Sequence, residues 1–302
     1  MASFLIAGGT GLVGSLLVQQ LLAEGHSVTL VCRSMPTDVM AQPRIRAVVS
    51  DLMLPEQMLE CLPREAFDAV VYLAQADNHH RFPANAYSAV ALNISAPVAL
   101  CQWAAEMRCG RFVYGSSGGI CGSQAGLQGR ITEGMSALTT TNLSFYLATK
   151  ARCEELLSAF RSEIPVTLLR YFFVYGPGQR SNFLFPRMRS RIIAGEPIVL
   201  ASGTGPHFNP IHARDAAYLT MRALFNNVDG PINIAGIEDS CLAEVVEMIS
   251  KCVGTSPKTS QTPDHPANYL ADITMAGRVL GRASISLGEG IRGAFGTDGA
   301  RI

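Results

Sequence analysis

A glycine-rich segment near the start of this 302-residue chain constrains its fold more than any other feature. Gly8, Gly11 and Gly14 follow a short apolar run and open an apolar helical pattern over residues 12–22. Glycines at this spacing permit a tight turn and let a pyrophosphate approach the backbone, while the helix start offers N–H groups and a positive dipole end. A second apolar run completes a strand–helix–strand unit of about thirty residues, the size of a βαβ crossover. The segment therefore predicts a dinucleotide-binding fold.

Apolar strand-like runs alternate with helical patterns along most of the chain. Strands are expected at residues 4–7, 28–31, 45–49, 69–73, 112–114, 166–169, 198–200 and 232–234, and helices at 12–22, 55–62, 87–107, 143–161, 183–194, 215–225, 242–252 and 274–280. Such alternation implies a parallel sheet that helices cover on both faces. The sequence predicts an α/β chain with a Rossmann-type doubly wound parallel sheet over residues 1–175. Residues 176–302 are expected to form a smaller substrate-binding lobe, interleaved with the end of the sheet.

Composition and charge exclude several classes of function. The chain is 48% hydrophobic and has a formal net charge of zero, so no broad charged surface is expected to attract nucleic acid or a membrane. No apolar run reaches the length of a membrane span, and the first residues indicate a strand and not a signal peptide. The eight cysteines form no C-x-x-C pair, which favours reduced thiols. We expect a cytoplasmic enzyme with a small-molecule substrate and no metal.

A tyrosine and a lysine stand where they could perform chemistry on the helix expected at 143–161. Tyr146 and Lys150 are four residues apart and so share one helix face. A phenol is a poor base near neutral pH, because its ordinary pKa is about 10. An ammonium at ~4 Å favours the phenolate by ~4 kcal/mol at an effective dielectric constant near ~20. We therefore expect Lys150 to lower the pKa of Tyr146, so that the phenol exchanges a proton with an alcohol or ketone. The alternative is that the two side chains merely share an exposed face.

The end of the second strand bears on the choice of cofactor. NAD sites usually carry an acid here that holds the ribose hydroxyls, whereas this chain has Cys32, followed by Arg33 and Ser34. A carboxylate would repel a 2′-phosphate, and an arginine with a hydroxyl would bind it. The sequence therefore favours NADP(H), with NAD(H) as the alternative. The competing interpretation of Arg33 is a solvated loop cation.

Taken together, the motifs resemble the extended short-chain dehydrogenase/reductase family, in its NAD-dependent epimerase/dehydratase group. The resemblance covers almost the full length and rests on Gly8–Gly14, Asp51-Leu52, Leu73-Ala74, Asn93, Ser116-Ser117, Tyr146-x-x-x-Lys150, Arg170–Gln179, His212-x-x-Asp215, and Asp272 with Ala276 and Leu280-Gly281. It implies that Tyr146 is the acid/base and that Ser117 hydrogen-bonds the reacting oxygen. It also implies that Lys150 lowers the pKa of Tyr146 and holds the nicotinamide ribose.

The same resemblance implies a set of cofactor contacts and an assembly. The expected cofactor-binding residues are Gly8, Thr10, Gly11, Leu12, Val13, Gly14, Arg33, Ser34, Asp51, Leu52, Leu73, Ala74, Gln75, Asn93, Tyr146, Lys150, Tyr171 and Val174. The helices at Tyr87–Met107 and Leu143–Arg161 are expected to form the interface of a homodimer.

Several positions depart from the family's pattern and bear on the substrate. Gly118 and Gly119 stand where the dehydratases carry an Asp-Glu pair, so no acid and base for elimination are expected there. Sugar-nucleotide members usually have an asparagine at the position of Phe173 and a phosphate-binding arginine near Phe208. These changes predict a more apolar pocket, unless an arginine from the helix at 183–194 replaces the missing one. The expected substrate-binding residues are His79, Ser117, Phe173, Asn182, Arg187 and Phe208.

Three functions are consistent with these features. The first is an NADPH-linked oxidoreductase that transfers hydride between the nicotinamide and a ketone or secondary alcohol carbon, with Tyr146 as acid/base. The second is a nucleotide-sugar epimerase, in which the same hydride leaves and returns within one turnover. The third is a catalytically inactive dinucleotide-sensing protein. Proteins of that third kind typically lose the tyrosine or the lysine, and this chain retains both.

Overall fold

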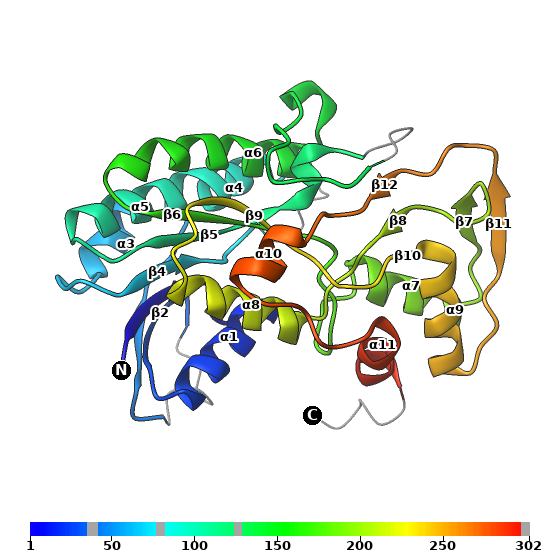
Figure 1. The fold of residues 1–302 in the computed structure, drawn as a ribbon, viewed down its shortest axis with the longest axis horizontal. Helices are drawn as coiled ribbons and strands as arrows, with labels where there is room; N and C mark the ends of the chain where they lie inside the picture. The colour runs from blue at the N-terminus through cyan, green and yellow to red at the C-terminus, as the bar shows by residue number, and fades with distance from the viewer. Residues whose placement is uncertain (35–41, 77–81, 124–128, 297–302) are drawn as a thin grey trace.

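A parallel sheet of seven strands forms the centre of the computed structural model, which describes residues 1–34, 42–76, 82–123 and 129–296 (Figure 1). The strands are β1 (Ser3–Ala7), β2 (Ser27–Cys32), β3 (Ile45–Val49), β4 (Ala69–Tyr72), β5 (Phe112–Ser117), β6 (Val166–Tyr171) and β9 (Gly230–Ile234). Their order across the sheet is β3-β2-β1-β4-β5-β6-β9, and all neighbours are parallel. The order reverses between β1 and β4, and in such sheets the ligand crevice lies at this switch point.

Helices cover both faces of the sheet, as the sequence predicted. One face carries α1 (Leu12–Ala23) and α8 (Ala213–Phe225), and the other carries α3 (Pro55–Cys61), α4 (Ala86–Val90), the π-helical turn η1 (Ala91–Ser95), α5 (Ala96–Glu106) and α6 (Phe145–Ser158) (Figure 1). A separate apolar core fills each side, and β1 contributes Phe4 and Ile6 to one and Leu5 and Ala7 to the other. The near-continuous apolar character of β1 follows from this burial on both faces.

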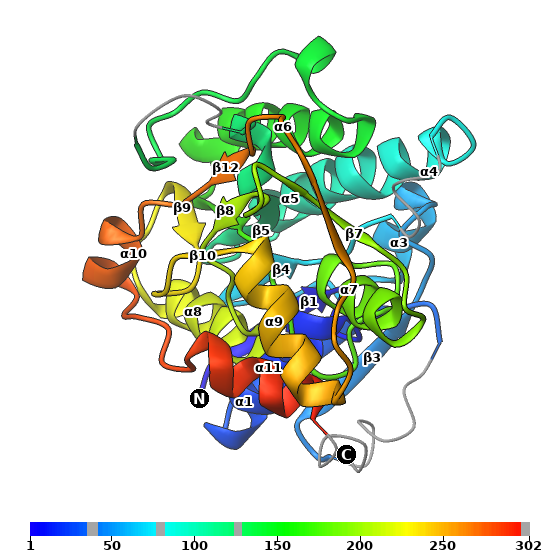
Figure 2. The same cartoon turned by 90° about the vertical axis from the view of Figure 1, so that its right-hand side faces the viewer.

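The smaller unit is built from the later part of the chain and lies at the carboxyl-end side of the sheet (Figures 1 and 2). It contains α7 (Leu184–Ile193), β7 (Ile198–Ala201), β8 (His207–Phe208), β10 (Ser240–Cys241), α9 (Leu242–Val253), β11 (Thr259–Thr262), β12 (Asn268–Tyr269) and α11 (Leu287–Phe295). Here β10, β8 and β12 form one small sheet and β11 pairs with β7. Between these elements the chain returns to the large sheet through α8 and β9, and α10 (Thr274–Val279) lies beside β9. The division into residues 1–175 and 176–302 stays a prediction.

Helix α11 and the two-residue strands were not predicted. Three glycines, at 288, 290 and 293, hid the helix pattern, although Ser286 and Glu289 form a capping box at its start. Gly290 is required by packing, because a Cβ there would lie 2.2 Å from the hydroxyl of Tyr175. The remaining short turns are η2 (Gly118–Cys121), η3 (Thr140–Asn142) and η4 (Ala159–Ser162).

One continuous helix, Ala86–Glu106, is long and apolar enough to span a membrane by length and composition. The sequence had predicted no such segment. Half of the apolar window is buried, and Ala96, Leu100 and Cys101 pack into the core beneath the sheet. Packing of this kind accounts for the apolar composition of the helix without a membrane.

Candidate active site

A cavity of about 860 Å³ opens at the carboxyl ends of the strands and reaches the smaller unit. One wall is made by the glycine loop and the ends of β2 and β4, and another by Ser117 and Tyr146. Residues 171–174, 178–180 and 183–185, with Tyr269, complete it on the side of the smaller unit. The cavity therefore joins the predicted cofactor loop to the predicted catalytic residues.

The glycine loop forms a cradle that larger residues would fill. A Cβ at Gly14 would lie 2.2 Å from the Gly8 carbonyl oxygen, and one at Gly8, where φ is 89°, would lie 2.4 Å from the Ala74 nitrogen. Helix α1 begins after Gly11 with no side-chain cap and no acid in its first turn. Its first N–H groups and dipole end therefore suit an anion. These features fit the pyrophosphate of a dinucleotide.

Most of the other predicted cofactor contacts line the same cavity. Thr10, Leu12, Val13, Arg33, Asp51, Leu52, Leu73, Ala74, Gln75, Tyr171 and Val174 all do so. Cys32 also lines it, and burial raises the pKa of its thiol, which keeps that group neutral. Asp51 is exposed and accepts a hydrogen bond from the Met53 nitrogen at 2.9 Å. Ser34 is exposed and does not line the cavity.

The structure brings Ser117 and Tyr146 to one wall, although 29 positions separate them in the chain. Ser117 is the last residue of β5, and its Oγ accepts a hydrogen bond from the Gly119 nitrogen at 3.3 Å. Tyr146 lies in the first turn of α6, which Ser144 caps by accepting from the Leu147 nitrogen. The Tyr146 hydroxyl donates to Gln75 Oε1 at 2.9 Å. The wall thus presents two hydroxyls, the pair that a reacting oxygen requires for hydrogen bonding and proton exchange.

In the chain by itself, burial and not the neighbouring Lys150 determines the direction in which the pKa of Tyr146 shifts. Lys150 is buried and does not line the cavity; its Nζ donates to the Gly115 carbonyl at 2.7 Å and lies 4.6 Å from the centre of the Tyr114 ring. Burial lowers the pKa of Lys150 to about 8, against the opposing effects of Cys153 and Glu154. Burial also raises the pKa of Tyr146 above its ordinary value. Desolvation therefore outweighs the i, i+4 attraction on which the prediction was based.

Asn93, which was expected to contact the cofactor, is fully buried in the protein and does not line the cavity. It comes from the π-helical turn, a feature common near functional sites. Its Oδ1 accepts from the Ala76 nitrogen at 3.3 Å, and its Nδ2 donates to Thr149 Oγ1 at 2.9 Å. Thr149 in turn donates to the Tyr146 carbonyl at 2.7 Å. Asn93 therefore ties the loop that carries Gln75 to the helix that carries Tyr146.

A buried ion pair beneath the site was not predicted. Arg170 on β6 and Glu154 on α6 have side chains that are each 7% exposed, and Nη2 lies 2.8 Å from Oε2. Arg170 Nη1 also donates to the carbonyls of Glu133 and Met135 at 3.2 and 3.3 Å. The pair fixes α6 to the sheet and to the segment after η2. The sequence offered no signal for it, because the partners are 16 positions apart and lie in different elements.

The predicted substrate residues lie in four different kinds of place. Phe173 lines the cavity, whereas Phe208 is fully buried behind it, with the two ring centroids 4.7 Å apart. Asn182 is half-buried and Arg187 is exposed, and neither lines the cavity. His79 lies outside the described residues. Of the described residues expected to bind substrate, Ser117 and Phe173 therefore line the cavity, and the apolar character of the substrate site stays a prediction.

The turn after Ser117 leaves no room for the acid and base of a dehydratase. A Cβ at Gly118 would lie 2.1 Å from the Phe172 ring, and one at Gly119 would lie 3.0 Å from the Leu147 side chain. An aspartate and a glutamate could enter only if both neighbours moved. Within the described ranges, no group of three His, Cys, Asp or Glu side chains could hold a metal ion.

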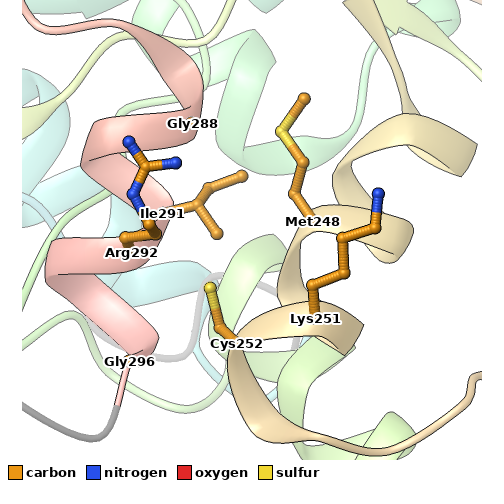
Figure 3. A pocket seen from close by; sticks show the side chains of 7 residues that line it. All are labelled: Met248, Lys251, Cys252, Gly288, Ile291, Arg292 and Gly296. Atoms are coloured by element: carbon orange, nitrogen blue, oxygen red, sulfur yellow. The ribbon is translucent and has the colours of Figure 1, made fainter.

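A second cavity, of about 360 Å³, lies between α9 and α11 (Figure 3). Met248 and Ile291 form apolar parts of its wall, and Lys251 and Arg292 lie on its two sides (Figure 3). It shares no lining residue with the larger cavity. None of the predicted catalytic or cofactor residues lies there.

Comparisons with known proteins agree with this geometry. Residues 4–235 match the model of the NAD dependent epimerase/dehydratase family. An uncharacterized UDP-glucose epimerase, YtcB, of Bacillus subtilis (strain 168) is 25% identical over 91% of both chains. A dTDP-4-dehydro-6-deoxy-D-allose reductase of a Streptomyces species is 22% identical over 91% of this chain and 90% of its own. Among solved structures, MoeE5 in complex with UDP-glucuronic acid and NAD is 27% identical over 97% of both chains, with a TM-score of 0.80.

Proposed function

Because the chain belongs to the NAD-dependent epimerase/dehydratase family, a family of enzymes that use a nicotinamide dinucleotide, we propose that it interconverts a ketone and a secondary alcohol. The favoured net reaction is the NADPH-linked reduction of a small-molecule ketone. The single observation that carries this proposal is the presence of the Ser117 and Tyr146 hydroxyls on the wall of the cavity that also contains the dinucleotide cradle.

Tyr146, Ser117 and Lys150 would each have a separate role in this reaction. The glycine cradle would hold the dinucleotide, whose reduced nicotinamide would supply the hydride that the carbonyl carbon receives. Tyr146 gives its proton to the carbonyl oxygen, so that C=O becomes CH–OH and the balance of one hydride and one proton is met. Ser117, whose Oγ accepts from Gly119, keeps its own proton for a hydrogen bond to the same oxygen. Lys150 stays mostly protonated below a pKa of about 8 and, through its bond to Gly115, holds the end of β5 in place.

The test of this function is the replacement of Tyr146 by phenylalanine. Tyr146→Phe removes the proton donor and the bond to Gln75 but leaves the glycine cradle unchanged. Turnover of a ketone, followed by NADPH absorbance, should fall by about 10²- to 10⁴-fold, while NADPH affinity stays within a few-fold of the parent. Near-normal turnover would remove Tyr146 from this role. Cofactor binding with no turnover of any substrate in the parent protein would instead favour the inactive sensing protein.

The choice of NADP(H) over NAD(H) is supported by the end of β2. Arg33 is exposed and lines the cavity, and the preceding Cys32 supplies no carboxylate to repel a 2′-phosphate. NAD remains the alternative, because MoeE5 and other solved relatives were determined with NAD.

A nucleotide-sugar epimerase is the second candidate, and the names of the relatives favour it. YtcB is described as a UDP-glucose epimerase, and MoeE5 was solved with UDP-glucuronic acid. The same catalytic hydroxyls would serve, with the hydride returned to the opposite face of the intermediate. The nucleotide that co-purifies with the protein distinguishes the two: retained, non-exchanging NAD(H) favours the epimerase, and exchangeable NADPH favours the reductase.

A homodimer through the helices on one face of the sheet is part of this proposal. Tyr87 on α4 is 75% exposed and Leu156 on α6 is 47% exposed, and Val90 lies one turn from Tyr87. Exposed apolar residues on these helices suit a subunit interface. Sedimentation velocity should give the mass of a dimer, and Leu156→Glu should shift it to the monomer. The eight free cysteines, most of them buried, suit a cytoplasmic location.

A further inference from the structure

Aromatic side chains line the end of the large cavity that reaches the smaller unit, and we propose that this end binds a planar, apolar body of the substrate. The inference rests on the proposed function and deepens it: the substrate class is an aryl or fused-ring ketone or alcohol, neutral or with one acidic group. A nucleoside diphosphate sugar is the class that it excludes.

Phe173 is the central residue of this end. It lines the cavity and has φ at 44°, in the left-handed region that is unfavourable for a residue with a Cβ. Its ring stacks on Phe208 at 4.7 Å with an interplanar angle of 25°, and meets Tyr269 edge-on at 5.6 Å. A strained backbone persists only where its surroundings determine it. The two ring contacts therefore hold Phe173 rigidly at the cavity wall.

The neighbouring lining residues extend this aromatic wall. Tyr269, which is half-buried, lines the cavity beside Phe173, and Phe183 with Leu184 lines it from the start of α7. Phe185, which also lines the cavity, meets Phe208 edge-on with the two ring centroids 6.4 Å apart. Rings prefer offset-stacked or edge-on partners. A planar ligand would find both arrangements at this wall.

Charge argues against a diphosphate at this end. Among the described residues that line the cavity, the cations are Arg33, which follows β2 beside the glycine loop, and Arg180. Arg187 is exposed away from the cavity, and Arg191 donates to the Pro197 carbonyl and lies 3.5 Å from Glu196. A diphosphate taken from water needs paired cations or several strong hydrogen bonds. One arginine near the aromatic wall suits at most one acidic group.

Binding can be measured separately from turnover. The protein is loaded with NADP⁺ and titrated calorimetrically with 2-acetonaphthone, a planar aryl ketone; two oxidised partners cannot exchange hydride. We expect saturable binding, and no detectable binding of UDP-glucose under the same conditions. The variant Phe173→Asn should weaken binding of the ketone about tenfold or more, because the stacked ring is lost. Asparagine tolerates the left-handed conformation, so this variant should keep its fold.

Two further variants make the test specific. Tyr269→Leu removes a second ring from the wall and should also weaken the ketone, whereas Phe225→Leu removes a ring that packs on Phe4 and His26 outside this cavity and should not. The proposal is overturned if 2-acetonaphthone does not bind, if Phe173→Asn binds it unchanged, or if UDP-glucose binds with low-micromolar affinity. Failure of the proposed reaction would show differently, as normal binding of the ketone with NADP⁺ but no reduction of it with NADPH.

Discussion

The hydroxyl of Tyr146 donates a hydrogen bond to the side-chain carbonyl of Gln75 across 2.9 Å. Tyr146 comes from the first turn of α6 and Gln75 from the loop after β4, and both side chains line the cavity. An amide oxygen accepts this proton but cannot remove it, and a bond to the neutral phenol opposes its ionisation. Gln75 therefore sets the orientation and proton affinity of the group that we assign as acid/base.

Substitutions at Gln75 should move the pH dependence of turnover in opposite directions. Gln75→Glu places a negative charge beside the phenol and should shift the limb that reports Tyr146 to higher pH. Gln75→Leu removes the acceptor and should shift the same limb to lower pH. The measurement is kcat against pH for both variants and the parent, with NADPH affinity as the control for the cofactor site. Shifts of both variants in the same direction, or no shift in either, would contradict this role of Gln75.

Removal of Arg33 should decrease the preference for NADPH. Arg33→Ala deletes the cation expected to meet the 2′-phosphate, so the Kd for NADPH should rise by about tenfold or more, while the Kd for NADH changes little. Fluorescence titrations of the two reduced cofactors give both constants. Arg214, an exposed cation at the start of α8 that does not line the cavity, offers a matched Arg214→Ala control. A parent protein that binds NADH as tightly as NADPH would remove the basis for this selectivity.

The burial of Lys150 should be visible in the dependence of stability on pH. Its pKa is lowered from 10.5 to about 8 in the folded chain, so the unfolded chain binds more protons between these values. The free energy of unfolding should therefore rise with pH across this interval, by about 3 kcal/mol from this residue. Below pH 8 the buried Lys150 is charged, and its full destabilising effect should be present there. Urea unfolding of the parent and of Lys150→Met at several pH values gives the difference in their free energies of unfolding. This difference isolates the contribution of Lys150, since the other groups titrate alike in both proteins. A stability difference that is constant between pH 8 and 10.5 would contradict the assignment.

The buried pair of Arg170 and Glu154 should be costly to break from one side. Arg170→Met leaves the Glu154 carboxylate without its partner at a site where both side chains are 7% exposed. We expect a loss of about 3–5 kcal/mol in the free energy of unfolding. The double variant Arg170→Met, Glu154→Leu should recover much of that loss, because no uncompensated charge remains. The exposed pair Arg152–Glu155 is the comparison, and Arg152→Met there should cost less than about 1 kcal/mol. An equal loss of stability from Arg170→Met and from Arg152→Met would contradict this prediction.

The sequence was sufficient for the features that depend on local pattern. The glycine spacing placed the cradle, and the alternation of strands and helices predicted the parallel sheet and its two covered faces. Ser117 and Tyr146 could be expected in one site because both match motif positions of the family that the sequence resembles. Helix α11 was missed, although its capping box was visible, because glycines weaken helix patterns.

Side-chain direction and burial could not be predicted, because sequence spacing does not determine them. Lys150 and Tyr146 share a helix face, but the lysine turns toward the Gly115 carbonyl. Asn93 occupies a motif position, yet the π-helical turn buries it away from the cavity. Phe208 contacts the wall through Phe173 and Phe185, and tertiary packing creates both contacts.

The close approach of Gly290 to Tyr175 has a consequence for the order in which the site forms during synthesis. Tyr175 stacks on Phe185 at 4.6 Å, Phe185 lies 6.4 Å from Phe208, and Phe208 stacks on Phe173, so a column of rings joins α11 to the cavity wall. Chains emerge from the ribosome N-terminus first, and the early segments can begin to fold before the rest is made. The cofactor cradle can thus form on a nascent chain whose substrate wall still lacks its outer support. Selectivity for the substrate would be among the last properties that this protein acquires as it is made.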